Sequence, residues 1–205
     1  MIRRIHLNRA PIVVKQLDAT GRSTVLRHML GLTPDDLRMR FGGPQSEASV
    51  HGYVSRIRFE RDALFGVFNH DLELVGLTHV GMGDEAEFGV SVRPTHRGRG
   101  IGTALFARAE EHARNHHLRT FYVHTLTENK PMLAIARKRK MRIITEASEA
   151  ECYLKLPPPD VASVTSEFLH DRVALFDYAL KAQVHAAVTL ARAFLPLDTS
   201  PAGAS

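Results

Sequence analysis

The chain of 205 residues has a formal net charge of +5 and one cysteine, Cys152, which suits one globular domain with an appendage and excludes an intramolecular disulfide. No stretch approaches the ~18 apolar residues of a membrane span, and residues 1–18 lack the apolar core of a secretory signal, so we expect a cytoplasmic protein. No Cys/His spacing resembles a zinc site, and we expect no metal.

The first half of the sequence predicts strands and helices of ordinary length. Its apolar residues recur with the two-residue period of strands or the 3.6-residue period of helices. Polar turns at 69–71 and 81–84 separate the later strands, as in hairpins. We predict strands over residues 12–17, 63–68, 72–80 and 87–92, and helices over 21–32, punctuated by Gly31 and Pro34, and over 45–58.

The second half predicts a helical crossover and a long terminal helix. One helix begins near Gly100, and Pro131 suits the first turn of the next helix. Further predicted elements are a strand over 120–126, a helix over 129–140 and strands near 141–146 and 151–156. After the break at 157–159, a helix over 160–195 carries the apolar stripe Leu169, Val173, Phe176, Leu180, Ala187, Ala191 and Phe194.

The order of these elements predicts the fold class. It is an α/β (α+β) domain with a mostly antiparallel central sheet, flanking helices and one helical crossover. We expect residues 1–157 to form this domain, 158–195 a C-terminal helical extension and 196–205 a disordered tail. The apolar stripe must be buried on its own domain or across a dimer, and we favour a homodimer through this helix.

The segment from Val90 to Thr103 has the pattern of an anion-binding turn. A buried strand runs into glycines at alternate positions, and these run into an amphipathic helix. Glycines let the backbone approach a ligand closely, and a helix N-terminus offers free N–H groups and a positive dipole end, which together suit a pyrophosphate. The Walker pattern fails because Thr103 and Ala104 follow the last glycine, and the dinucleotide fingerprint fails because residue 103 is not glycine.

The positive charge of the chain is concentrated around this loop. Residues 93–142 hold twelve Lys/Arg and three Asp/Glu, a balance of 12 − 3 = +9, whereas the other 155 residues hold 15 basic and 19 acidic side chains, a balance of −4. Such a segment attracts a polyanion, either a nucleotide with several phosphates or a nucleic acid, or it is a solvated face. The basic run 137–142 admits the same three interpretations: a solvated face, a contact with a phosphate of the nucleotide, or nucleic-acid binding.

The spacing R-x-x-G-x-G of Arg97, Gly100 and Gly102 resembles the acetyl-CoA-binding motif of the Gcn5-related N-acetyltransferase (GNAT) family. The resemblance covers residues 11–157 and implies a GNAT-like fold, with the backbone of Val90 and Val92 pairing with the pantetheine arm. Asn129 resembles the family's L-x-x-N asparagine and is expected to contact the coenzyme, although Asn is also an ordinary helix N-cap. The residues expected to bind the pyrophosphate are Arg97, Gly98, Arg99, Gly100, Ile101, Gly102 and Thr103.

Acetyl transfer to an amine needs a base for the ammonium proton and an acid for the departing thiolate. Glu87 matches a position at which some family members carry a glutamate base; the alternative is an exposed strand carboxylate. The tyrosine acid of many members corresponds here to Ala136, so the acid is not identified. Substitutes by residue type alone are Tyr122, His124 and Tyr153. Cys152 has no visible activating partner, so we expect no acyl-cysteine route.

The sequence thus predicts an enzyme that moves an acetyl group from acetyl-CoA, its cosubstrate, directly to a primary amine of a small molecule or protein. One alternative is a non-catalytic acyl-CoA-binding regulatory module, favoured by the missing tyrosine. A weaker alternative is a nucleic-acid-binding protein, favoured by the basic segment. No membrane partner is expected. Asp35, Asp36 and Glu47 are scattered candidates for binding the acceptor amine, whose identity the sequence does not reveal.

Overall fold

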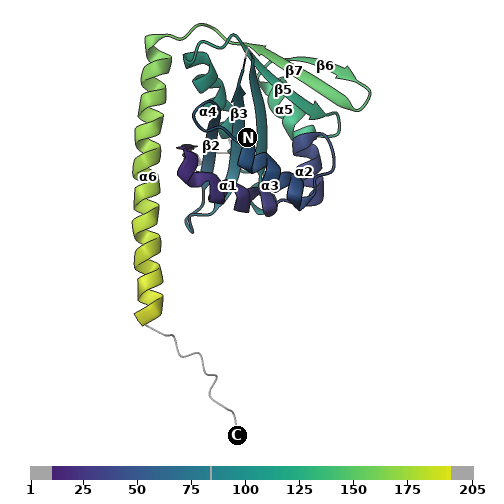
Figure 1. The fold of residues 1–205 in the computed structure, drawn as a ribbon. Helices are drawn as coiled ribbons and strands as arrows, with labels where there is room; N and C mark the ends of the chain where they lie inside the picture. Colours follow the sequence, from purple (N-terminus) through teal and green to yellow (C-terminus); the bar gives the residue numbers. More distant parts are fainter. Residues whose placement is uncertain (1–10, 84, 195–205) are drawn as a thin grey trace, which may run out of the picture.

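In a computed structural model, which describes residues 11–83 and 85–194, the chain forms a seven-stranded mixed sheet with helices on both faces and one long helix beside it (Figure 1). The order of the strands is β1-β2-β3-β4-β5-β7-β6. The α/β class predicted from the sequence is therefore confirmed. The strands are β1 (Lys15–Leu17), β2 (Ala63–Phe68), β3 (Leu74–Met82), β4 (Ala86–Val92), β5 (Thr120–Leu126), β6 (Arg142–Glu146) and β7 (Glu149–Lys155).

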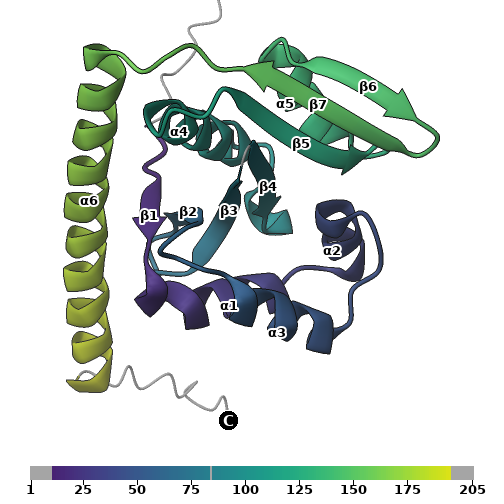
Figure 2. The same cartoon turned by 45° about the horizontal axis from the view of Figure 1, so that its top comes forward.

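Neighbouring strands pair antiparallel except β4 and β5, which are parallel and are connected through the helix α4 (Ile101–Asn115). The mostly antiparallel sheet with one helical crossover is thus as predicted. The β4–β5 pairing is short, because it holds only Ala86 opposite Phe121 and Glu87 opposite Tyr122. Beyond this point the two strands part, and Figure 2 shows the β5-β7-β6 half of the sheet set apart from the β1–β4 half.

The remaining helices include one that the sequence interpretation missed. They are α1 (Arg22–Leu30), α2 (Pro34–Phe41), α3 (Glu47–Arg56), α5 (Lys130–Lys138) and α6 (Val161–Phe194), with the 3-10 helices η1 (Ala19–Gly21) and η2 (Pro94–His96). The strand predicted from residue 12 begins only at Lys15. The interpretation of Pro34 only as a break after the first helix was wrong, because Pro34 lies in the first turn of α2.

Local capping explains why α2 forms. Thr33 and Asp36 make a capping box, in which each side chain accepts a hydrogen bond from the other residue's backbone N–H at 3.2 Å. Gly42 ends the helix in a left-handed conformation with φ 77°. The stretch from 33 to 42 therefore carries both a start and a stop signal within eight helical residues.

The sheet separates two hydrophobic cores. One lies between the sheet and the helices α4 and α5, and includes Phe88, Phe106 and Phe121 in mutual ring contact. The other lies under α1 and α3 on the opposite face (Figure 2). Because both faces are covered, β2 is buried along its whole length.

A fully buried histidine attaches α1 to the sheet. The Nδ1 of His28 lies 2.8 Å from the carbonyl oxygen of Leu74 in β3, and Nε2 lies 2.8 Å from Oγ of Ser91 in β4. Burial lowers the pKa of His28 to about 4, and the nearby charge of Arg93 adds to this effect. The imidazole is therefore neutral at physiological pH.

The long helix α6 stands beside β1 and α4, with its last turns extending beyond the domain (Figure 1). The predicted stripe does not face the domain, since Leu169, Val173, Phe176 and Leu180 are each more than half exposed. None of the helices in the described ranges is both long and apolar enough to cross a membrane. The tail 196–205, expected to be disordered, lies outside the described residues.

Candidate active site

The glycine-rich loop turns sharply between η2 and α4. Gly98 and Gly100 have φ angles of 70° and 93°, in the left-handed region that favours glycine. Gly100 is the N-cap of α4, and the first N–H groups of a helix have no intrahelical partner. The positive end of the α4 dipole adds to their attraction for anions. This is the geometry that the sequence predicts for a pyrophosphate site.

A cavity of about 640 Å³ opens beside this loop. Its walls come from α2, the end of β4, the loop, the first turn of α4 and one side of α5. It lies where β4 and β5 have parted. Its size lies in the range of ligand pockets. Nine of the ten residues expected to bind the coenzyme line it, namely Val90, Val92, Arg97, Gly98, Gly100, Ile101, Gly102, Thr103 and Asn129.

Two predicted site residues do not line the cavity. The guanidinium of Arg99 instead donates to the carbonyl oxygen of Thr95 at 3.1 Å. Glu87 lies near the start of β4, in the part of the strand that pairs with β5, and its side chain is exposed. The structure thus gathers the expected coenzyme residues in one place and leaves the expected base outside this cavity.

The missed helix α2 forms one wall of the cavity and is tied across it by ion pairs. Arg97 of the loop pairs with Asp36 and also donates to the carbonyl oxygen of Val92 at 3.2 Å. Arg38 pairs with Glu128 on the opposite wall. Partial burial alone raises the pKa of Asp36, but the hydrogen bonds from Arg97 and Thr33 outweigh it and lower that pKa below its ordinary value.

Asn129 is the N-cap of α5, one of the two roles considered for it. Its Oδ1 accepts a hydrogen bond from the backbone N–H of Met132 at 3.2 Å. Its amide nitrogen donates to Oγ1 of Thr125 at 3.0 Å. These bonds fix the side chain at the edge of the cavity that it lines, so the capping role does not exclude ligand contact.

Glu87 faces Tyr122 across the last pair of the β4–β5 ladder. The Tyr122 hydroxyl donates to Glu151 at 3.3 Å, and burial together with Glu151 raises the pKa of Tyr122 to about 12. Tyr153 also donates to Glu151, at 2.9 Å. Ala136, at the position of the family's tyrosine, is fully buried in the core. Both tyrosines therefore have carboxylate partners of their own.

The remaining candidates from the sequence have other contacts. Asp35 and Asp36 both line the cavity, where Asp35 pairs with Arg38 at 2.9 Å and Asp36 pairs with Arg97. Glu47 is exposed, lies 3.8 Å from His51 and does not line the cavity, so the three carboxylates do not form one acceptor site. His124 lies 3.3 Å from Glu149. Cys152 is fully buried, and burial raises the pKa of its thiol, which disfavours a nucleophilic thiolate.

A polar cluster that the sequence interpretation missed lies beside β4 on the face covered by α3. The Tyr53 hydroxyl is 2.6 Å from Nδ1 of His79, and Nε2 of His79 is 3.2 Å from Asp62, although not aligned for a hydrogen bond. Arg40 of α2 donates to the Tyr53 hydroxyl at 3.2 Å. Burial, followed by the charge of Arg40, lowers the pKa of His79. Only folding brings these residues together, from α2, α3, the loop before β2, and β3.

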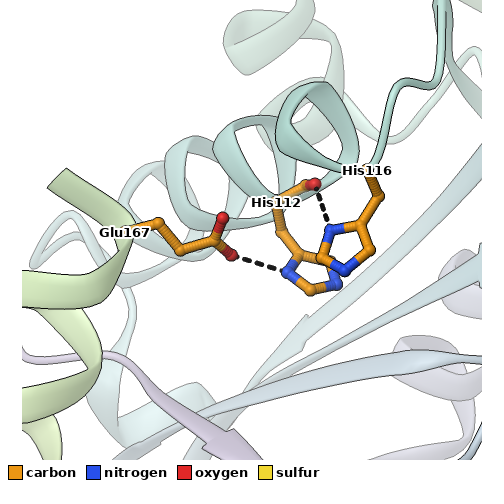
Figure 3. A group of neighbouring side chains, drawn as sticks. All are labelled: His112, His116 and Glu167. Carbon is orange, nitrogen blue, oxygen red and sulfur yellow. Dashed lines mark hydrogen bonds and ion pairs between the residues drawn. The ribbon is translucent and has the colours of Figure 1, made fainter. Parts of the chain in front are cut away.

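Three residues between α4 and α6 could hold a metal ion. His112, His116 and Glu167 each offer one ligand atom, and these atoms lie within 4.8 Å of one another (Figure 3). His112 already bonds Glu167 at 2.6 Å, and the same carboxylate accepts from Arg108 at 2.9 Å and from Asn115 at 2.6 Å. A second cation beside Arg108 is electrostatically unfavourable, so this arrangement fits a hydrogen-bonded attachment of α6 better.

Comparison with known proteins points to one family. The model of the acetyltransferase (GNAT) family matches residues 35–141. No curated protein sequence matches the chain. Among solved structures, the GNAT domain of S. lividans PAT is similar with a TM-score of 0.60 and 18% identity, over 70% of this chain and 89% of that one.

Two further solved structures show the same fold with coenzyme bound. Spermidine N-acetyltransferase from Vibrio cholerae, in complex with CoA and spermine, has a TM-score of 0.57 and 18% identity, over 70% of this chain and 95% of that one. PaiA N-acetyltransferase from Thermoplasma acidophilum, in complex with coenzyme A, has a TM-score of 0.53 and 15% identity, over 71% and 99% of the two chains.

Proposed function

The chain belongs to the acetyltransferase (GNAT) family, and from this premise we propose that it transfers an acetyl group from acetyl-CoA to a primary amine of a small molecule or protein. The observation that carries the proposal is the cavity at the parting of β4 and β5, because the glycine loop at the N-terminus of α4 forms one end of it. A pyrophosphate at that loop would meet the positive end of the α4 dipole and the first N–H groups of α4, which have no intrahelical partner.

In this proposal the coenzyme lies along the cavity, from the glycine loop to the inner end of the cavity beside β4. The N–H groups at 97–103 hold the pyrophosphate, the backbone of Val90 and Val92 pairs with the pantetheine arm, and Asn129 borders the arm from α5. Arg97 is held by Asp36 in the free chain, so the phosphates compete with that carboxylate for its guanidinium. Arg99 contributes charge from outside the cavity.

We assign the proton transfer to Glu87, directly or through a water molecule. The acceptor ammonium loses one proton to Glu87, the free amine attacks the thioester carbon, and the C–S bond breaks. The second proton leaves the nitrogen and ends on the departing thiolate. Direct transfer is supported by the burial of Cys152, which leaves no accessible thiol for an acyl intermediate there.

A non-catalytic acyl-CoA-binding module is the second candidate. The observation that favours it is Ala136, which stands fully buried where many family members carry a tyrosine acid. Tyr122, which faces Glu87 across the β4–β5 ladder, and Tyr153 both donate to Glu151 instead. If the chain is an enzyme, the departing thiolate would take its proton from solvent. If the chain is a module, it would bind the coenzyme without transferring the acetyl group.

Thermal unfolding with and without acetyl-CoA tests binding first. At a ligand concentration of 100 times Kd, the free energy of unfolding should rise by about 2.7 kcal/mol. No shift with acetyl-CoA rejects the enzyme and the module together. If the coenzyme binds, release of free thiol across a panel of primary amines separates the two. The cytoplasmic location expected from the sequence stays a prediction.

We further propose that the chain is a homodimer through α6. Twelve of the fourteen exposed large hydrophobic side chains in the described residues lie on this helix. Its three acidic and three basic residues sum to zero charge, which gives no attraction to an anionic membrane surface. Oligomers also occur among similar folds, since the spermidine N-acetyltransferase of Vibrio cholerae has a dodecameric structure.

The area of the stripe is sufficient for a dimer. A helix of 34 residues is about 51 Å long. An apolar stripe about 100° wide on such a helix presents on the order of 500 Å². Two copies that bury their stripes against each other remove roughly 1,000 Å² from water, which is the lower limit for a specific interface.

A further inference from the structure

Arg40 places a guanidinium directly on β4 at the inner end of the cavity. It lines the cavity from α2. A Cβ atom added to Gly89 would lie 1.9 Å from Cζ of Arg40 and 2.1 Å from both terminal nitrogens. Any side chain at residue 89 would therefore displace the guanidinium. The glycine in the middle of this strand is explained by the arginine that lies on it.

The charge of Arg40 has no carboxylate partner in the described part of the chain, where no Asp or Glu oxygen lies within 4.0 Å of it. One terminal nitrogen donates to the Tyr53 hydroxyl at 3.2 Å, and the rings of Phe41 and Tyr53 lie 5.2 and 5.9 Å away. A guanidinium has five N–H donors. The aromatic contacts orient it and leave most of its donors available for an anion.

The pyrophosphate of the coenzyme is too distant to be that anion. Gly89 precedes Val92, the last residue of β4, by three positions, which is about 10 Å along a strand. The phosphate loop begins only beyond Val92. The pantetheine arm between the two ends carries no charge. An anion at Arg40 must therefore come from the acceptor or from the reacting carbonyl.

Glu87 lies two residues from Gly89 on the same face of β4. The strand therefore presents a carboxylate at residue 87 and a guanidinium above residue 89, two positions that lie about 7 Å apart along the strand. A small molecule with an amine at one end and a carboxylate at the other fits between these two groups, with its amine toward Glu87 and its carboxylate toward Arg40. The planar fork of arginine suits bidentate binding of a carboxylate.

We propose that Arg40 is a specificity-determining residue that binds the carboxylate of the acceptor, so that the substrates are amino acids rather than polyamines. This inference rests on the proposed acetyl transfer. A second ammonium, such as a polyamine carries, would be repelled by Arg40 at this position. The pocket therefore differs in charge from what a polyamine requires, even though the fold is shared with a protein crystallised with spermine.

The test compares matched acceptors on the full-length protein. Each α-amino acid is assayed beside the monoamine that lacks its carboxylate, for example phenylalanine beside phenethylamine. The wild-type protein should prefer at least one amino acid by more than about tenfold in kcat/KM, because a site built for a polar group discriminates strongly against its absence. In R40Q this ratio should fall to near one, because the loss in kcat/KM should be larger for the amino acid than for its amine.

Controls separate this role from a structural or oxyanion role. R56Q carries the same change on an exposed arginine of α3 and should leave the ratio unchanged. R40K keeps the charge without the fork and should give an intermediate ratio, and it replaces R40Q if that variant does not fold. An equal loss for the amino acid and its amine in R40Q would indicate contact with the reacting carbonyl and overturns the proposal.

The failure of this proposal is distinguishable from failure of the proposed function. If acetyl-CoA stabilises the protein and amines without a carboxylate react faster than their amino acids, the acetyl transfer stands and the carboxylate site is wrong. If acetyl-CoA binds but no acceptor reacts, the shift in thermal unfolding that amino acids cause in the presence of CoA tests the carboxylate site. A shift that R40Q abolishes supports the site, and its absence overturns it.

Discussion

Glu87 is exposed and lies in β4 at the point where the pairing with β5 ends. It faces Tyr122 across the last β4–β5 pair, and beyond it the strands part to form the cavity. In the proposed complex the coenzyme occupies the cavity from the loop toward its inner end, so a base must reach the acceptor amine from beyond the coenzyme. An exposed carboxylate next to the inner end meets this requirement, either directly or through one water molecule.

Replacing Glu87 with glutamine should lower kcat for a verified acceptor by about 100-fold, the lower end of the effect of a positioned base. The acid limb of the pH–rate profile should also change, because the group that must lose its proton is gone. E85Q is the matched control, since Glu85 is another exposed carboxylate two residues earlier. Unchanged kcat and an unchanged profile in E87Q would remove Glu87 from the mechanism.

The sequence predicts the residues of the glycine loop well, because their conformation depends on neighbours along the chain. Gly98 and Gly100 have the positive φ angles that alternating glycines suggest. Arg40 could not be found in this way, since its significance depends on Gly89, 49 residues later. A glycine within an apolar strand was the only signal, and it indicates a close approach without naming the group that approaches.

Among the elements, α1 packs on the sheet through buried apolar side chains such as Val25 and Met29, and one buried imidazole adds hydrogen bonds to two strands. His28 bridges β3 through the Leu74 carbonyl and β4 through the Ser91 hydroxyl. Ser91 also lines the cavity, so the helix and the coenzyme strand share one hydrogen-bonded contact. Burial keeps the ring neutral, so Nδ1 donates to the carbonyl oxygen and Nε2 accepts from the Ser91 hydroxyl.

Acid should therefore weaken this attachment. The unfolded chain protonates His28 near pH 6.5, whereas the folded chain resists protonation down to about pH 4. The stabilising contribution is complete above pH 6.5 and is lost as the pH falls to 4, by about 3 kcal/mol. H28Q should be less stable at pH 7.5 and should lose less stability across this window.

Urea unfolding at a series of pH values measures this difference. Carboxylates such as Glu167, whose hydrogen bonds with His112 and Arg108 lower its pKa despite the opposing effect of burial, also destabilise the fold in acid. The informative quantity is therefore wild type minus H28Q. H117Q, at an exposed histidine, serves as the control. Parallel curves for wild type and H28Q between pH 6.5 and 4 would contradict the assignment.

The order of elements was predictable except where capping signals were read as breaks. Strands 63–68 and 120–126 have their predicted bounds. The helix α2 was missed because Thr33, Pro34 and Gly42 look like punctuation between longer elements, although together they start and stop a short helix. The consequence is functional, since α2 carries Asp36 and Arg40, two residues of the cavity wall.

At the scale of the whole molecule, α6 has its polar side turned inward. Glu167 and Asp171 pair with Arg108 of α4, and Lys181 donates to the carbonyl oxygen of Phe68 at 3.2 Å. The apolar stripe faces away from the domain. An ordinary surface helix has the opposite arrangement, with apolar residues toward its own core. The polar contacts fix the rotation of the helix, and this rotation leaves the stripe exposed.

A second copy of the chain is the occupant that we propose for the stripe. Leu169, Val173, Phe176 and Leu180 repeat at intervals of four and three residues, the spacing of helices that pack side by side. Light scattering on the wild-type protein should give twice the chain mass of 22.8 kDa. A double variant, Phe176→Glu with Leu180→Glu, should give a monomer, because two charges would be buried in each stripe.

The variant should keep its stabilisation by acetyl-CoA, since these side chains do not contact the domain that forms the cavity. Thr189→Glu places the same charge on the opposite side of the same helix and should remain a dimer. A monomeric wild-type protein at high micromolar concentration would disprove the self-association. Sedimentation of that monomer with anionic vesicles would assign the stripe to a membrane surface instead, against the zero net charge of the helix.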